Sequence, residues 1–342
     1  MRTNRSWSFQ PRTLLAVALS FALGPSLAHS QDPHDSRVAS TGSALSPAAG
    51  RGQAVVPGSG QKLDQVGDDF EAEDWQYLQH LPKSTRDLDQ QDHFPVGEAA
   101  NGRWYEGILR GQPDVVKRVP TPADGLAGSR GSLLLQSLWT GIPAQPQRVL
   151  GQDDLIADVN YRLQSSIPAT LSPSVVVRVF LPPVTTWENR TGPHFGFRVA
   201  LETQRVKPTT NVHFSQAKPE FETYWPGMFI EFQTKSGENE NYYAHLRIRA
   251  NEQGYDFRSQ QITATGWWTL GMSLTPDGMV HYYASPGVDD LAAADYLGSL
   301  YPYGYRAVAL KTFFFNVCNG DDGRSWSTAW IIDDPSVFVL RR

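Results

Sequence analysis

The sequence predicts an all-β fold, a two-sheet antiparallel jelly-roll sandwich. Apolar residues recur at every second position from Ser174 onward, which is typical of strands with one buried and one outward face. Turn-forming residues, among them 29 Gly and 24 Pro, interrupt the chain often, and helical periodicity is almost absent. Since strands do not alternate with long helices, a parallel sheet is not expected, and two packed antiparallel sheets are.

The strands follow one another with short breaks. The residues Val175, Val177 and Val179 form the apolar face of one expected strand. The sequence Pro276-Asp277-Gly278 predicts the turn of a hairpin. The expected strands are 133–138, 174–181, 195–204, 228–233, 242–250, 269–274, 279–284, 307–317 and 330–340. Residues 70–75 are a further strand candidate, 110–114 a loop, and 289–297 the one short helix.

The N-terminus predicts export. Arg2, Arg5 and Arg12 precede an apolar run over 14–23, followed by small residues, so residues 1–30 are interpreted as a signal peptide. Residues 31–63, rich in Ser, Ala, Gly and Pro, are expected to be a disordered tether, and 64–342 a single β-sandwich domain. The apolar run is too short for a stable membrane span, so we expect a secreted or extracytoplasmic protein of the periplasm or cell envelope.

Charge and cysteine content narrow the function classes. The net charge is -5 with both signs interspersed, and no basic stripe is present, so nucleic acid is not an expected partner. The single cysteine, Cys318, excludes an intrachain disulfide. Because it ends an apolar run, Cys318 is expected to be a small buried hydrophobe and not a nucleophile.

Three segments together resemble the concanavalin A-like lectin/glucanase superfamily, which includes laminin-G-like modules. They are 68–71 with Trp75, the hairpin 266–283 led by Trp267-Trp268, and the closing 329–334. The resemblance implies a secreted, lectin-like, carbohydrate-binding sandwich. The opening and closing segments are also similar to galactose-binding-like jelly-roll modules, so two sandwich types stay open, and both lead toward a polysaccharide or glycan.

The catalytic branch of that superfamily is not matched. Family 16 glycoside hydrolases carry Glu-x-Asp on one strand, and in this chain no glutamate has an aspartate two residues later. A hydrolase or lyase would need groups from different strands, for which Glu231, His245 and Glu202 are the catalytic candidates. The alternative for Glu202 is a cross-strand ion pair with Arg247 or Arg249.

A polar sheet face and exposed aromatic rings are the predicted ligand-binding features. Alternation puts polar side chains on the non-core face of three strands, where they could bind sugar hydroxyls, while aromatic rings could stack on sugar rings. The candidates are Arg198, Gln233, Tyr243, Arg247, Arg249, Tyr224, Trp225 and Trp268. The alternative is an ordinary solvated face and tryptophans in the core.

Carboxylates near both ends suggest a structural Ca²⁺ site. Asp69 and Glu71 near the start and Asp334 near the end would converge if the terminal strands pair, and such oxygen clusters suit Ca²⁺. The alternative is that these residues form turns. No other cofactor is expected, because the histidines lack metal-ligand spacing.

Three functions are compatible with the sequence. The first is a non-catalytic glycan-binding protein, which the tether, the ten tryptophans and the missing hydrolase motif favour. The second is a polysaccharide hydrolase or lyase on the same fold. The third is a cell-envelope structural or adhesion domain that binds protein.

Overall fold

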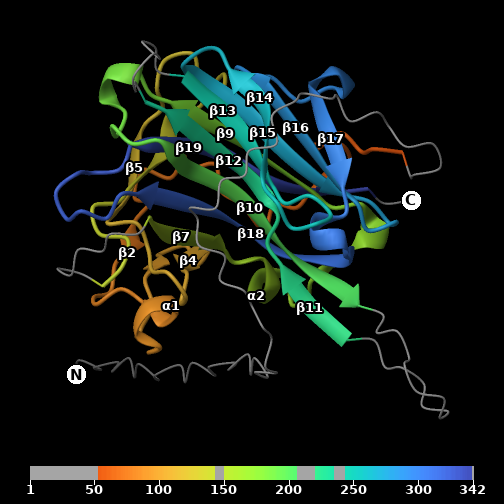
Figure 1. The fold of residues 1–342 in the computed structure, drawn as a ribbon, viewed down its shortest axis with the longest axis horizontal. Helices are drawn as coiled ribbons and strands as arrows, with labels where there is room; N and C mark the ends of the chain where they lie inside the picture. Colours follow the sequence, from red (N-terminus) through yellow and green to blue (C-terminus); the bar gives the residue numbers. More distant parts are fainter. Residues whose placement is uncertain (1–52, 143–149, 206–219, 235–242, 341–342) are drawn as a thin grey trace, which may run out of the picture. The chain divides into compact units, whose positions relative to one another are not determined.

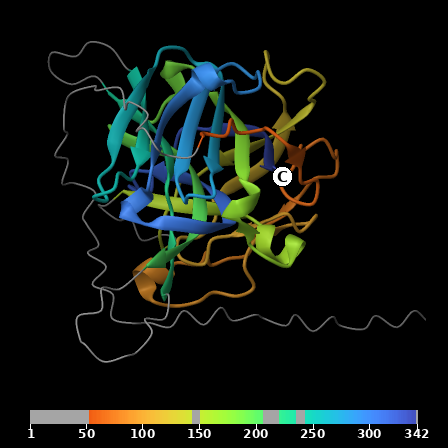
Figure 2. The same cartoon turned by 90° about the vertical axis from the view of Figure 1, so that its right-hand side faces the viewer.

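The protein folds as two antiparallel sheets packed face to face, in a computed structural model that describes residues 53–142, 150–205, 220–234 and 243–340 (Figure 1, Figure 2). The predicted all-β jelly-roll sandwich is therefore confirmed. The first sheet has the order β17 (Tyr296–Leu300), β16 (Val280–Pro286), β15 (Gly266–Leu274), β9 (Ser174–Leu181), β19 (Trp330–Val339), β6 (Gly131–Gln136) and β5 (Val115–Pro120), with β1 (Gln61–Lys62) beside β19.

The second sheet carries the longest strands, β10 and β18, at its centre. Its order is β14 (Phe257–Ile262), β13 (Tyr243–Arg249), β12 (Gly227–Gln233), β10 (Gly192–Arg205), β18 (Arg306–Asn319), β7 (Gly151–Ala157), β4 (Trp104–Glu106), β3 (Glu98–Ala99) and β2 (Tyr77–Leu78), with β11 (Glu220–Tyr224) on β10 and β8 (Ile167–Pro168) on β18. The helices of the described residues are short: α1 (Arg86–Asp89), α2 (Val159–Leu163) and the 3₁₀ turns η1 (Ala169–Leu171), η2 (Val184–Thr186), η3 (Ala293–Asp295) and η4 (Pro302–Gly304). None of these helices is long and apolar enough to cross a membrane.

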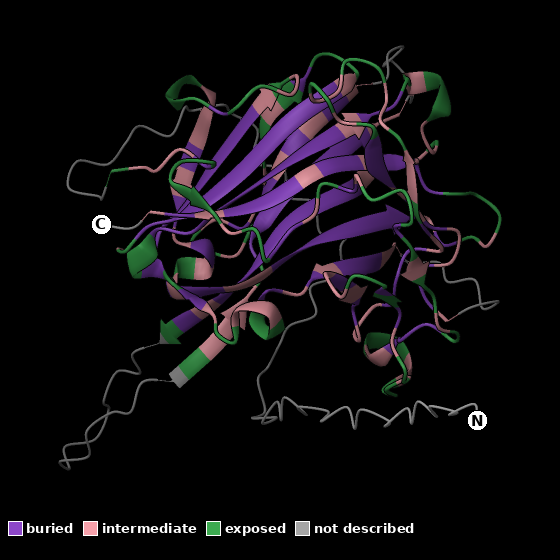
Figure 3. Ribbon diagram, turned by 180° about the vertical axis from the view of Figure 1, so that it is seen from behind, coloured by how far each residue is buried: buried purple, intermediate pink, exposed green. Residues whose placement is uncertain are grey.

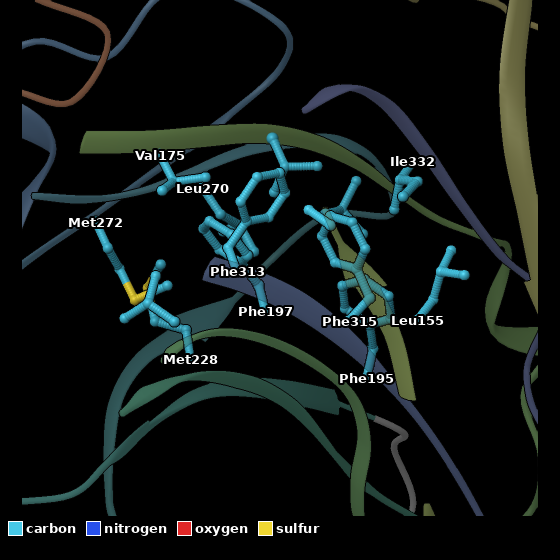
Figure 4. Packing of buried hydrophobic residues seen from close by; sticks show 14 of the residues in the cluster. Leu155, Val175, Phe195, Phe197, Met228, Leu270, Met272, Phe313, Phe315 and Ile332 are labelled. Carbon is cyan, nitrogen blue, oxygen red and sulfur yellow. The ribbon is translucent and has the colours of Figure 1, made fainter. Parts of the chain in front are cut away.

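The core lies between the sheets and is built from alternate residues of each strand. From the second sheet Phe195, Phe197, Phe313 and Phe315 point inward, and they are all buried (Figure 4). The facing side chains of the first sheet include Val175, Leu270 and Ile332 (Figure 4). Burial is continuous along the central strands and gives way to exposure in the connecting loops (Figure 3).

Aromatic packing fixes the position of β4 in this core. The Trp104 ring meets Phe313 edge-on at a centroid distance of 5.6 Å and lies 5.7 Å from Phe315. Edge-to-face pairs of this kind add about 1 kcal/mol beyond area burial. Cys318 on β18 is buried, as predicted, and burial raises the pKa of its thiol to about 12.

The nine strands that alternation predicted are present, and two other predictions were wrong. Residues 70–75 are not a strand, because Phe70 has a φ of 55° and its amide donates to Asp68 Oδ1 at 3.2 Å in a turn. The expected helix over 289–297 is reduced to η3, and the extended strand β17 begins at Tyr296. Strand β7 was not predicted; its sequence Gly-Gln-Asp-Asp-Leu-Ile-Ala carries two buried aspartates in place of apolar residues.

Residues 53–63 were expected to belong to a disordered tether, but they contact the sandwich. The described part of it pairs with the sandwich: Gln61 lies across from Val339 in β1–β19, and the Ser273 hydroxyl donates to the Val55 carbonyl at 2.6 Å. Val56 packs against a small cluster that contains Val176, Tyr283 and Leu291. Residues 1–52, including the predicted signal peptide, lie outside the described residues.

Candidate functional site

The outer face of the second sheet gathers the polar residues that alternation had singled out. Strands β10, β12, β13 and β14 are neighbours, and their inward residues, such as Phe197, Met228 and Ile248, are buried in the core. Residues of the opposite parity therefore point outward. We define the arginine face by Arg198, Phe229, Glu231, Gln233, Tyr243, His245, Arg247, Arg249, Asp256 and Arg258.

Glu231 is the anionic centre of the arginine face. Its side chain is 4% exposed and accepts hydrogen bonds from Arg247 Nη1 at 3.2 Å and from Arg258 Nη2 at 2.5 Å. Gln233 Nε2 donates to the same carboxylate at 2.9 Å. A buried carboxylate requires hydrogen-bond partners, and these contacts hold two guanidinium groups at fixed positions.

A second carboxylate, Asp256, contacts Arg247 as well and also contacts Arg249. Its oxygens lie 3.3 Å from Arg247 Nε and 3.0 Å from Arg249 Nε. The side chains of Arg247, Arg249 and Arg258 are 28%, 35% and 34% exposed, whereas those of Glu231 and Asp256 are 4% and 9% exposed. The two carboxylates are thus buried, whereas the three guanidinium groups are partly accessible.

Arg198 lies deeper in the same face. Its guanidinium is between the rings of Phe229 and Phe314, at 5.6 and 5.1 Å from their centroids, and donates twice to the Trp225 carbonyl. Burial, and then repulsion from Arg249 and Arg110, lowers the pKa of Arg198 to about 9. It stays positively charged at neutral pH, so the face carries four positive charges and two carboxylates. The neighbouring Arg110 and Asp154 add one charge of each sign beside Arg198.

His245 is directly opposite Glu231 in the β12–β13 register. Partial burial, followed by the charge of Arg258, lowers the pKa of the His245 ring, so the ring is neutral near pH 7. Its Nδ1 is buried and has no hydrogen-bond partner among the described residues, and the Tyr243 ring meets the imidazole edge-on at a centroid distance of 5.2 Å. A neutral imidazole can accept a proton, and since Nδ1 is buried, a proton from a ligand would have to reach Nε2.

The structure does not bring Glu202 to this site. Glu231 is across from Pro193, and Glu202 is nine residues farther along β10, a separation of roughly 30 Å at 3.3 Å per residue. Paired glycosidase carboxylates lie within about 10 Å of each other. The predicted combination of Glu202 with Glu231 was therefore wrong, and so was its ion pair with Arg247 or Arg249, which bind Asp256.

Trp225 and Tyr224 are on opposite faces of the sheet. Tyr224 pairs with the core residue Leu201, stacks on Tyr305 at 4.7 Å, and donates its hydroxyl to Glu222 at 2.8 Å. Trp225 is 39% exposed, in the connection between β11 and β12. The predicted exposed aromatic pair is thus reduced to Trp225.

Trp268 is a core residue, so its prediction as a ligand platform was wrong. Its side chain is 1% exposed and its indole nitrogen donates to the Ala264 carbonyl at 3.0 Å. The adjacent Trp267 points to the other face and is also buried, against Phe180. Loop residues cover that outer face, with Ala123 accepting from the Trp267 indole, so neither ring is free.

The predicted calcium ligands do not converge. The terminal segments do meet, as expected, because the Asp68 amide donates to the Pro335 carbonyl at 3.1 Å. Glu71 instead accepts from the Arg130 and Gly131 amides, Asp69 accepts from the Glu71 amide, and Asp334 binds Lys62 and Arg178. In the described ranges no group of three His, Cys, Asp or Glu side chains is close enough to hold a metal ion.

Two members of the arginine face, Arg258 and Asp256, were not predicted. Arg258 belongs to β14 and Asp256 directly precedes it. The sequence of β14, Phe-Arg-Ser-Gln-Gln-Ile, lacks apolar alternation because it is an edge strand with little burial. The signal that could have found them is the turn Asn251–Gly254 after β13, which predicts a returning strand.

Comparisons with known proteins add a general likeness of shape. No family model matches the chain, and no curated protein matches it by sequence. Similar solved structures include a carbohydrate esterase from Shiga toxin-encoding bacteriophage phi24B (10% identity, 70% of this chain and 91% of that chain, TM-score 0.40) and alginate lyase PA1167 from Pseudomonas aeruginosa (7%, 67% and 87%, 0.35).

A third similar structure is alginate lyase A1-II′ of polysaccharide lyase family 7 (13% identity, 76% of this chain and 100% of that chain, TM-score 0.34). At such identities and TM-scores no residue role is carried over from these proteins. Membership of the concanavalin A-like superfamily stays a prediction, since no family match supports it.

Proposed function

We propose that the chain is an exported protein that binds acidic polysaccharides through the arginine face. One observation carries the proposal: four arginines and two buried carboxylates share one sheet face, in a chain whose net charge is -5. A local excess of positive charge on a negative protein attracts an anionic ligand. Sugars that bear carboxylate or sulfate groups fit this charge.

The donors that remain on the arginines suit such groups. A guanidinium has about five N–H donors in a planar fork, and the bonds of Arg258 to Glu231 use two of its nitrogens. The remaining donors belong to a side chain that is 34% exposed. Bidentate binding of a ligand carboxylate or sulfate by Arg is stronger and more directional than binding by Lys. Gln233 and Tyr243 add polar and aromatic contacts for sugar hydroxyls and ring faces.

The test is a titration of the purified protein with acidic and neutral polysaccharides at low salt. We expect binding to polyuronates or sulfated glycans and none to neutral glucans. Arg258→Gln should lower the affinity on the order of tenfold, as expected for the loss of a charge-assisted bond. The matched control is Arg130→Gln, because Arg130 is 75% exposed but pairs with Glu71 away from this face.

Equal affinity of both variants, or wild-type binding to neutral glycans alone, would refute the proposal. If no glycan binds at all, a cell-envelope adhesion domain that binds protein becomes the better interpretation.

A second function, polysaccharide lyase activity, is favoured by His245. A neutral imidazole beside arginines is suited to remove a proton from the carbon next to a sugar carboxylate, while an arginine stabilises the negative charge that develops. As the double bond forms, the bond to the glycosidic oxygen breaks and that oxygen takes up a proton from water. Incubation with polyuronates should then give products with the ultraviolet absorbance of unsaturated sugars, and His245→Gln should abolish them. Binding without any such product supports the non-catalytic function.

A further inference from the structure

The arginine face continues beyond β12 to an exposed tryptophan. Across β10 the register runs without a break: Arg198 pairs with Gly227, the Val199 amide donates to the Pro226 carbonyl at 3.0 Å, and Leu201 pairs with Tyr224. Trp225 is therefore across from Ala200. Residues opposite each other in antiparallel strands share a face, so Trp225 points to the same side as Arg198.

The backbone that carries Trp225 is fixed in place. Arg198 Nε and Nη2 donate to the Trp225 carbonyl at 3.1 and 2.6 Å, and the following Pro226 is buried. Its outward neighbours are small, with Ala200 across the strand pair and Gly227 next along its own row. The indole is consequently exposed on a rigid support, and a rigid aromatic surface loses little entropy when a ligand stacks on it.

The spacing along the row sets the size of the ligand. From Glu231, where Arg247 and Arg258 converge, to Trp225 the chain advances six residues, roughly 20 Å at 3.3 Å per residue. A single sugar cannot reach both ends, whereas several linked sugar rings can. The two ends also differ in chemistry: one presents guanidinium donors for an anionic group, the other the flat apolar surface on which the C–H face of a sugar ring packs.

We propose that Trp225 is a separate stacking subsite and that the protein recognises an extended acidic oligosaccharide lying along β12 and β13, with acid groups at Arg247 and Arg258 and a sugar ring on the Trp225 indole. This inference rests on the proposed function of the arginine face. It adds that the ligand is several sugars long and not a monosaccharide.

The experiment measures affinity as a function of ligand length. Acidic oligosaccharides of one polymer, from the disaccharide upward, are titrated into the wild-type protein, Trp225→Ala, Trp225→Phe and the control Trp326→Ala. Trp326 is the other exposed tryptophan of the described residues, 44% exposed and between β18 and β19.

We expect wild-type affinity to rise with length until the oligosaccharide spans the row and then to level off. Trp225→Ala should weaken the long oligosaccharides roughly five- to tenfold, the size expected for one aromatic stacking contact. The loss for the disaccharide should be smaller, because a disaccharide held at Arg247 and Arg258 does not reach the indole. Trp225→Phe should restore part of the loss, and Trp326→Ala should behave as wild type.

Other results separate the two proposals. Wild-type binding that does not depend on length, or an equal loss for short and long ligands in Trp225→Ala, overturns the stacking subsite while the arginine face stands. An equal loss in Trp326→Ala also overturns it. If the wild-type protein binds no acidic oligosaccharide of any length, the proposed function itself is wrong.

Discussion

Glu231 binds two arginines of the arginine face, and its replacement should change stability and ligand affinity in opposite directions. In Glu231→Gln, Arg247 and Arg258 lose their shared anionic partner, so we expect the free energy of unfolding to fall by about 1–2 kcal/mol. The same change removes one negative charge from the face, so affinity for acidic glycans should rise. Denaturant unfolding and ligand titration of this variant check the two effects.

The matched control is Glu73→Gln, an exposed glutamate in the segment before β2 and outside the arginine face. We expect it to change neither stability nor affinity beyond about 0.5 kcal/mol. Weaker acidic-glycan binding by Glu231→Gln would contradict the role of charge, and loss of a measured cleavage activity would restore Glu231 as a catalytic residue.

His281 makes stability depend on pH. The ring is 1% exposed on β16, with Nε2 at 2.7 Å from Thr275 Oγ1 and Nδ1 bonded to Ser299, and burial lowers its pKa to about 4. The unfolded chain, with a histidine pKa of about 6.5, takes up the proton first, so stability is lost as pH falls from about 6.5 toward 4.

The expected loss from this histidine between pH 7 and pH 5 is about 2 kcal/mol. His281→Gln keeps a polar side chain without the titration, so its unfolding free energy should vary less over this interval than that of the wild type. Denaturant unfolding of both proteins at the two pH values measures the difference. Parallel pH profiles would show that His281 does not titrate as its burial requires.

At the scale of elements, the packing of residues 53–58 on β15 depends on a glycine. A Cβ at Gly271 would be 2.7 Å from Pro57 Cβ and 2.4 Å from a Leu291 methyl group. Gly271→Ala should therefore destabilise the protein by about 1–3 kcal/mol through overpacking. Pro57→Gly removes one of the two obstacles, so the double variant should lose less stability than the sum of the single variants.

A thermodynamic cycle of these three variants by denaturant unfolding tests this contact. Strict additivity would mean that the segment before β1 does not pack on the first sheet. The segment had been expected to be a tether because it lacks large apolar residues, yet Val56 and Pro57 suffice to dock it beside a glycine. Composition predicts average behaviour, and two well-placed contacts override it.

At the scale of the whole molecule, charge distribution rather than net charge governs the expected binding. The affinity for acidic glycans should fall as salt rises, because the Debye length shortens to about 8 Å at physiological ionic strength. Arg258→Gln, with one positive charge fewer, should show a shallower salt dependence than the wild type. Titrations at three salt concentrations check this, and affinity that is independent of salt would contradict an electrostatic mode.

The sequence alone predicted which residues of β10, β12 and β13 point outward, and it predicted the hairpin of β15 and β16. These features are local: a period of two along one strand fixes the face of each side chain, and Asp277-Gly278 fixes the turn. Arg198, Glu231, His245 and Arg247 could therefore be named together before their contacts were known.

Tertiary structure alone decided which outward residues meet and which aromatic rings are free. Trp225 and Trp268 look alike in sequence, yet only Trp268 is covered, because a sheet packs over it. Glu202 and Glu231 have the same parity but are far apart along β10, while Arg258 and Asp256 reach Glu231 and Arg247 from an edge strand without apolar alternation. Strand neighbours and register arise from contacts between distant segments, and the periodicity of a single strand does not contain them.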